Sequence, residues 1–175
     1  MSTLFLIEAT PAADALVTLA DIDTRVAAHG AQLIEAQVTT GGRLFAIIEA
    51  EDSDVVAQAL EGLDADVSDA APVRLVGADL DAIKAARPEA GYLVEWDIPE
   101  GISMETYLER KAAKTPLYAS VPEVAFLRTY VREDMQKCLC FYDGPDEAAI
   151  GRARDAVSTP IDRLHVLSPF PAVVL

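Results

Sequence analysis

The sequence predicts an α+β protein built from two tandem units, each with the element order βαββαβ. Short apolar stretches bounded by turn residues alternate with stretches of helical periodicity, and the same order occurs twice within the 175 residues. Residues 44–57 (LFAIIEAEDSDVVA) also align without a gap with residues 138–151 (CLCFYDGPDEAAIG). Self-similarity of this kind indicates that one structural unit is repeated, so we predict an internal duplication.

In the first half, turn and capping residues mark where each element begins and ends. Gly30 is a typical residue to end a helix, Thr40-Gly41-Gly42 is a turn signal between two strands, and Asp52 or Ser53 is placed to cap the next helix. Strands are therefore expected over residues 4–9, 33–38, 44–49 and 72–76, and helices over residues 13–29 and 53–60.

The second half repeats this order after a connector. Ser103 and Asp146 are placed to cap two helices, and Pro99 and Gly101 mark a turn after the first strand. Strands are expected over residues 92–97, 124–131, 138–142 and 161–167, and helices over residues 80–87, 104–114 and 147–157. We expect the first unit to span residues 1–76, the connector 77–91, the second unit 92–167 and an apolar tail 168–175.

The βαββαβ order is that of the ferredoxin-like unit, whose helices cover one face of its sheet. The other face of each sheet must be covered or used. The simplest cover is one sheet against the other, which predicts a dimeric α/β-barrel-like arrangement within one chain. The alternative is that each sheet pairs with a second copy of the chain.

Composition excludes several classes of partner. The net charge is −15 and no basic cluster is present, so nucleic acid and anionic membranes are not expected partners. No apolar run reaches the length of a membrane span, and no basic segment precedes the first apolar residues as it would in a signal peptide. Two cysteines at positions i and i+2 do not form a disulfide framework, so we expect a cytoplasmic protein.

The chemistry of the chain gathers on the strand that holds both cysteines. Strand alternation places Cys138, Cys140 and Tyr142 on one face and Leu139 and Phe141 on the other. The larger apolar pair suits a helix-packed core, so we expect the thiols and the phenol on the open face. The positions equivalent to Cys140 and Tyr142 in the first half hold alanine and isoleucine, which indicates that the second unit carries the site.

Glu95 is expected next to these residues, because the first and third strands of such a unit are neighbours. A carboxylate, two thiols and a phenol could together bind a soft or borderline metal. Tyr118 and Tyr130 are further pocket candidates, and His165 is a candidate ligand or general base. Plain packing is the other interpretation of the cysteines, since buried cysteine often acts as a small apolar residue and C-x-C lacks the second pair of a zinc site.

Three short sequence motifs in the second half point to a known family. In chain order they are Thr129-Tyr130-Val131, then Lys137, Cys140 and Tyr142 in one strand, then Pro145-Asp146-Glu147. Because of these motifs, residues 92–167 resemble a small ferredoxin-like bacterial family of unknown function that has nickel-binding members. The resemblance implies binding of a metal, nickel in particular, or of a small ligand. In that family the following helix commonly reads Ile-x-x-His, whereas this chain has Ala153 at the histidine position.

We therefore expect a protein that binds a metal ion or a small molecule on the open face of the second unit. Cofactor contacts are assigned to Glu95, Tyr130 and Tyr142, and metal contacts to Cys138, Cys140 and His165. One alternative is an isomerase or cyclase in which Glu95 or His165 moves a proton. Another is an assembly module that uses residues 170–175 to extend a partner's sheet, and a homodimer is an option in each case.

Overall fold

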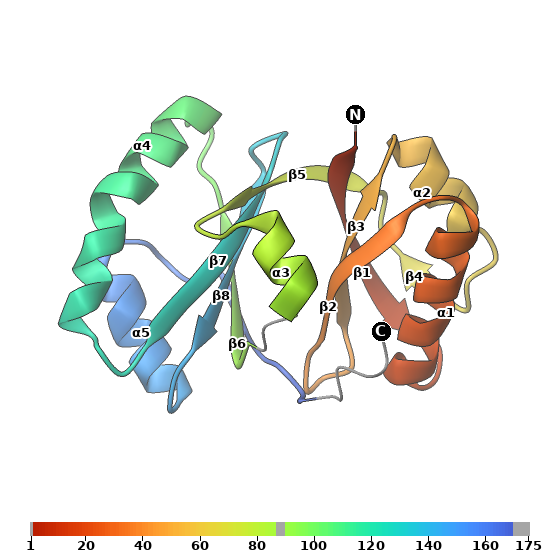
Figure 1. The fold of residues 1–175 in the computed structure, drawn as a ribbon. Coiled ribbons are helices and arrows are strands. Elements are labelled where there is room, and N and C mark those ends of the chain that lie inside the picture. Colours follow the sequence, from red (N-terminus) through yellow and green to blue (C-terminus); the bar gives the residue numbers. More distant parts are fainter. Residues whose placement is uncertain (1, 87–89, 170–175) are drawn as a thin grey trace. The chain divides into compact units, whose positions relative to one another are not determined.

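The computed structural model describes residues 2–86 and 90–169 and divides them into two compact units. Unit 1 holds residues up to 74, the segment 79–86 and residues 167–169, and unit 2 holds residues 75–78 and 90–166. Each unit is a mixed α/β layer in which helices pack on an antiparallel sheet (Figure 1).

Unit 1 is built around strand β1. Its elements are β1 (Thr3–Pro11), α1 (Ala15–Ala28), β2 (Gln32–Val38), β3 (Leu44–Ala50), α2 (Ser53–Ala59), β4 (Ala65–Val67), β5 (Ala71–Val76) and α3 (Leu80–Ala86). The strands are ordered β2-β3-β1-β5, and β4 also pairs with β1. The apolar stripe Leu19, Ile22 and Val26 of α1 is fully buried against this sheet, as its helical spacing predicts.

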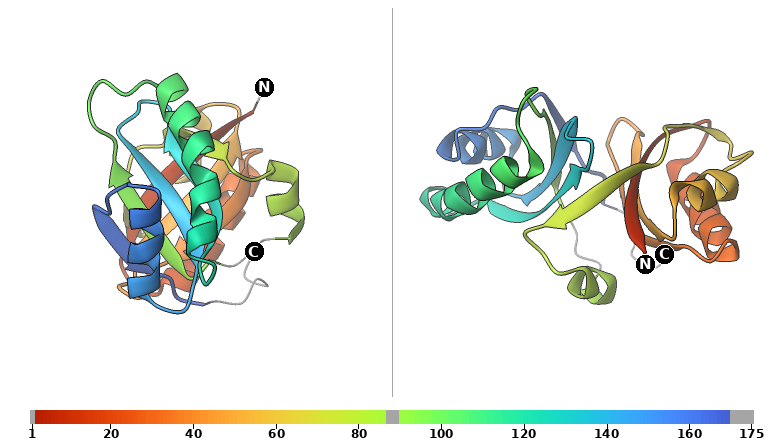
Figure 2. Two further views of the ribbon diagram at one scale, coloured as in Figure 1. Left: turned by 90° about the vertical axis from the view of Figure 1, so that its left-hand side faces the viewer. Right: turned by 90° about the horizontal axis from the view of Figure 1, so that it is seen from above.

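Unit 2 repeats this plan and adds a short 3₁₀ helix. Its elements are β6 (Tyr92–Asp97), α4 (Met104–Lys114), η1 (Thr115–Ser120), β7 (Ala125–Arg132), β8 (Lys137–Asp143), α5 (Glu147–Ala156) and β9 (Arg163–Val166). The strands are ordered β7-β8-β6-β9, which confirms that the first and third strands of the unit are neighbours. Helices α4 and α5 lie side by side over one face of this sheet (Figure 2).

Two elements escape the sequence patterns. Strand β4 has three residues within an Asp- and Ala-rich loop, too few for a two-residue period to be visible. Helix η1 continues directly from α4, with Pro116 in its first turn. Proline removes a backbone donor, so the chain leaves the α-helical path here, and the resulting turn carries Tyr118 over the sheet.

Among residues 2–86 and 90–169, no helix is both long and apolar enough to cross a membrane. The apolar segment 170–175, which the assembly hypothesis invokes, lies outside the described residues.

The two units share a capping feature that allows a direct stability test. The Asp146 carboxylate accepts a hydrogen bond of 2.8 Å from the Ala149 N–H at the start of α5, and Asp52 caps α2 in the same way. Replacing Asp146 by alanine leaves this donor without its partner. We expect Asp146→Ala to lower the free energy of unfolding by about 1 kcal/mol in urea denaturation. Asp155→Ala, an exposed change in the last turn of α5, is the control, and equal effects of the two changes would contradict the assignment.

Candidate functional site

The thiols of β8 lie on the helix-covered face of the unit 2 sheet, so the prediction that they face the open side is wrong. Cys138, Cys140 and Tyr142 are buried in one cluster with Tyr107 of α4 and Ala153 of α5. The prediction failed because it ranked the two faces by side-chain size. Both faces are buried, and the alternate residues of β8 are no more than 1% exposed, so size does not identify the helix side.

Glu95, Tyr130 and His165 lie on the opposite face of the sheet from the thiols. Glu95 pairs across the strands with Leu139, and Tyr130 makes an edge contact with the Phe141 ring. The six predicted site residues are therefore divided by the sheet into two groups of three. The group around Glu95 and the group around Cys140 cannot hold one ligand together.

Glu95 is 2% exposed and its carboxylate is held by three basic side chains. Its Oε1 accepts from Lys137 Nζ at 2.6 Å, and its Oε2 lies 2.9 Å from Arg163 Nε and 2.7 Å from His165 Nε2. Burial would raise the pKa of Glu95, but the hydrogen bonds from Lys137 and His165 outweigh it and lower the pKa to about 2. A carboxylate with so low a pKa is a weak base at neutral pH, which disfavours Glu95 as a proton-transferring residue.

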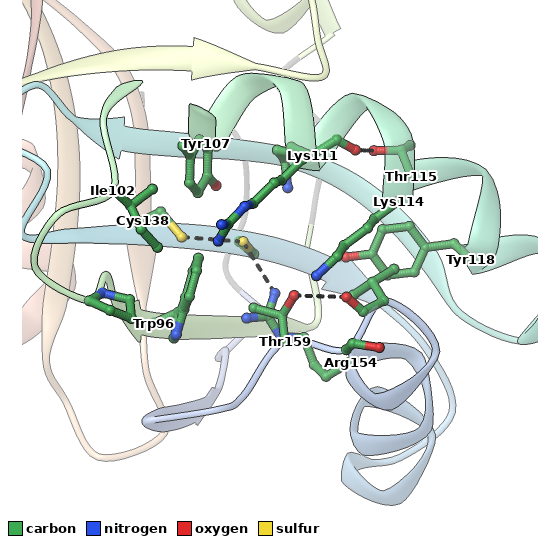
Figure 3. Close-up of a pocket in the computed structure, with 15 residues that line it drawn as sticks. Trp96, Ile102, Tyr107, Lys111, Lys114, Thr115, Tyr118, Cys138, Arg154 and Thr159 are labelled. Carbon is green, nitrogen blue, oxygen red and sulfur yellow. Dashed lines mark hydrogen bonds between the residues drawn. The ribbon is translucent and has the colours of Figure 1, made fainter. Parts of the chain in front are cut away.

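A cavity of about 170 Å³ lies on the helix-covered face, between β6, β8, α4, η1 and the end of α5. Lys111, Lys114 and Arg154 line it from α4 and α5, and Figure 3 shows Arg154 joined to one of the two thiols. Apolar and aromatic groups form much of the wall, among them Trp96, Ile102, Tyr107, Tyr118 and Val157. Because both thiols also line this space, it is the place in unit 2 where their chemistry can meet a ligand.

The charge of the cavity wall is opposite to the charge of the protein. Its lining includes Arg110, Lys111, Lys114 and Arg154 and no aspartate or glutamate, although the chain carries a net charge of −15. Within the part of the chain that the structure describes, none of the four makes an ion pair with a carboxylate. Lys111 instead places its Nζ 4.3 Å from the ring centroid of Phe126.

Arg154 is the most unusual of these cations because it is only 2% exposed. Its Nη1 donates to Tyr142 Oη at 3.1 Å and approaches Cys140 Sγ at 3.7 Å, and its Nη2 donates to the Pro160 carbonyl at 2.8 Å. Its Nε is buried and has no hydrogen-bond partner among the described residues. A guanidinium rarely remains buried without a carboxylate or another anion, because leaving the charge uncompensated costs several kcal/mol, by order of magnitude.

The two thiols form a coupled pair beside Arg154. Their Sγ atoms are 3.9 Å apart, and Thr129 Oγ1 donates to Cys140 Sγ at 3.3 Å. The hydrogen bond from Cys138, with the charges of Lys111 and Arg154, lowers the pKa of Cys140 against the opposing effect of burial. The same hydrogen bond raises the pKa of Cys138. These surroundings favour the ionised form at Cys140 over the ionised form at Cys138.

Sequence reasoning missed Arg154 and Lys111. A signal for Arg154 was present, because it follows Ile150 by four residues and so continues the buried stripe of α5. Lys111 follows Tyr107 by the same spacing on α4. Tyr118, a pocket candidate from the sequence, does line the cavity, and its hydroxyl reaches Tyr142 Oη at 2.7 Å because η1 folds back over the sheet.

The donor set of the cavity does not fit a nickel ion. No group of three or more His, Cys, Asp or Glu side chains comes together among residues 2–86 and 90–169. Ala153, at the position of the family histidine, is fully buried beside the thiols and offers no ligand. Lys111 and Arg154 would also repel a divalent cation.

The Glu95 cluster leads to a prediction about acid stability. The folded-state pKa is depressed from 4.5 to about 2, so the stabilisation is fully present above pH 4.5 and is lost as the pH falls toward 2. We expect Glu95→Gln to lower the free energy of unfolding by roughly 2 kcal/mol at pH 7. In urea denaturation across this pH range, the difference from wild type should shrink progressively. A difference that is the same at pH 7 and pH 3 would contradict the assignment.

Comparison with solved structures shows the fold. The chain superimposes on a protein assigned as a chlorite dismutase, TA0507, with a TM-score of 0.56, 13% identity and 95% coverage of each chain. A mutant chlorite dismutase from Candidatus Nitrospira defluvii, in complex with cyanide, gives a TM-score of 0.52 and 12% identity, covering 96% of this chain and 92% of the other. These likenesses extend over nearly the whole chain and concern its architecture.

Comparison of sequences finds a match only in the second half of the chain. No curated protein matches the chain. Residues 92–166 match the family model described as nickel responsive protein SCO4226-like, which agrees with the resemblance found in the strand and helix signatures. The match covers the strands and helices of unit 2, less than half of the chain, and leaves unit 1 outside it.

Proposed function

We propose that unit 2 binds a small organic anion, a carboxylate on a ring-bearing body, in the cavity beneath α4 and η1. The observation that carries the proposal is the Arg154 guanidinium, buried at the cavity wall with no carboxylate partner among residues 2–86 and 90–169. A buried charge of this kind is stabilised when a ligand supplies the missing anion. Unit 2 is then a small-molecule binding unit, the broader function that its sequence predicts.

The size and lining of the cavity support a ligand with an apolar body. A cavity of about 150 Å³ holds one benzene-sized ring, and this one measures about 170 Å³. Trp96, Tyr107 and Tyr118 supply aromatic surface for a ring, while the charges lie on α4 and α5. Apolar walls with a few convergent polar groups are typical of small-ligand sites.

A purely structural role explains the lysines better than it explains Arg154. Lys111 and Lys114 occupy the last turn of α4, where the helix dipole favours positive charge. Arg154 is also in the last turn of its helix, but it points inward, and its Nε has no partner within the described chain. The orphaned Nε–H is the donor we assign to the ligand carboxylate, and Lys111 supplies a second positive charge at the cavity wall.

Nickel binding is the second candidate, and the family match of residues 92–166 favours it. A binding mode for nickel in this chain would have to use Cys138 and Cys140 with ligands from outside the protein. Two thiolates beside Arg154 and Lys111 form a poor site for a divalent ion, since the nearby positive charges oppose it. The anion hypothesis accounts for these charges and the nickel hypothesis does not.

Benzoate and benzamide test the anion hypothesis directly, because they have nearly the same shape and differ in charge. We expect benzoate to bind at least tenfold more tightly, since a charge-assisted hydrogen bond contributes roughly 1.5–3 kcal/mol and tenfold corresponds to about 1.4 kcal/mol. Isothermal titration calorimetry at constant ionic strength measures both affinities. Equal affinities, or no saturable binding of benzoate, would overturn the proposal.

Two charge variants localise this binding. Lys111→Gln removes a positive charge from the cavity wall and should weaken benzoate binding several-fold. Arg152→Gln is the matched control, because Arg152 is exposed on α5, pairs with Glu123 and does not line the cavity. Equal losses in the two variants would show a non-specific effect of charge and would count against this site.

The nickel hypothesis has its own measurement. We expect protein prepared without a histidine tag to retain no stoichiometric nickel after incubation with NiCl₂ and gel filtration, because the donor set is incomplete. Elemental analysis of the eluted protein gives the metal content. One nickel per chain in wild type, lost in Cys140→Ser, would establish nickel binding and contradict our reading of the donor set.

A further inference from the structure

We propose that Cys140 is the nucleophile of a reactive-thiol site that forms a covalent bond with an anionic carbon electrophile. This inference rests on the proposed anion site and deepens it by naming a reaction and a substrate class. The substrate class is a carboxylate that carries, on a nearby carbon, a group that a thiolate can displace.

The surroundings of Cys140 are those of a stabilised thiolate. Its Sγ lies 3.3 Å from Thr129 Oγ1, 3.9 Å from Cys138 Sγ and 3.7 Å from Arg154 Nη1. A hydroxyl donor, a guanidinium donor and a neighbouring thiol thus surround one sulfur. Neighbouring cations and hydrogen-bond donors are what make a cysteine nucleophilic, because the thiolate is the reactive form.

The same geometry places an anionic substrate next to the sulfur. Arg154 contacts Cys140 through Nη1 and leaves Nε for another acceptor, so one guanidinium can hold both the thiolate and a ligand carboxylate. Lys111 supplies the second positive charge at the cavity wall. Two negative groups that would otherwise repel are brought together by the cations between them.

The chemical step balances without an oxidant or reductant. The Cys140 thiolate attacks the electrophilic carbon, an S–C bond forms, and the bond to the leaving group breaks. The leaving group departs with the bonding electron pair. The proton of the Cys140 thiol passes to solvent before the attack, and the Thr129 hydroxyl and the Arg154 guanidinium stabilise the thiolate that remains.

Iodoacetate and iodoacetamide are the probes, since they carry the same displaceable iodide and differ in charge. Toward an isolated thiolate, like-charge repulsion makes iodoacetate the slower reagent. In this protein we expect iodoacetate to alkylate Cys140 about tenfold faster than iodoacetamide, because a cationic pocket concentrates anions. Peptide mass spectrometry over time gives the rate at each cysteine, and the urea-unfolded chain gives the intrinsic ratio.

Variants identify the groups responsible. Cys140→Ser should abolish the fast reaction, whereas Cys138→Ser should keep it, because a serine hydroxyl can donate the same hydrogen bond. Lys111→Gln should lower the iodoacetate-to-iodoacetamide ratio several-fold, and Arg152→Gln should leave it unchanged. Benzoate should protect Cys140 in wild type. Far-ultraviolet circular dichroism confirms that each variant is folded.

The possible failures point to different parts of the account. If Cys140 in the folded protein reacts with neither reagent faster than in the unfolded chain, the reactive-thiol proposal is overturned, and benzoate binding still decides the anion site. If Cys140 reacts quickly but prefers iodoacetamide, the sulfur is reactive and the anion site is refuted. Faster reaction at Cys138 would also overturn the assignment of the nucleophile.

Discussion

The charge of Arg154 is the constraint on which the chemistry of unit 2 depends. An arginine at this position of α5 is carried into the core by the same helical stripe that buries Ala149, Ile150 and Ala153. Its charge cannot be relieved by losing a proton, since a guanidinium keeps its proton in proteins. The surroundings must therefore provide electron density, and they do so through Tyr142 Oη, the Pro160 carbonyl and Cys140 Sγ.

The two faces of the unit 2 sheet show opposite solutions to burying a charge. On one face, the Glu95 carboxylate is saturated by Lys137, Arg163 and His165, which gives a low pKa and no capacity for a further ligand. On the other face, Arg154 donates to the Tyr142 hydroxyl and the Pro160 carbonyl and approaches the sulfur of Cys140. Its Nε–H has no acceptor among the described residues. A saturated ion cluster is typical of structure, whereas an unsaturated buried cation beside a cavity is typical of a binding site.

Much of the fold could be predicted from local signals. Asp52, Ser103 and Asp146 cap helices where they were expected to, and the order of strands in unit 2 follows from the βαββαβ pattern. The candidate site could be predicted only in part. Alternation correctly grouped Cys138, Cys140 and Tyr142, but which face they occupy depends on how helices pack, and residue size does not encode that when both faces are buried.

The most direct test of the central claim is to observe the Nε–H group of Arg154 itself. Its ¹H–¹⁵N resonance can be identified by its loss in Arg154→Lys and followed by NMR during titration with benzoate and benzamide. The account predicts a large, saturable shift with benzoate and little change with benzamide, because the carboxylate supplies the acceptor that this donor lacks. A resonance that is unmoved by benzoate while other cavity residues respond would contradict it.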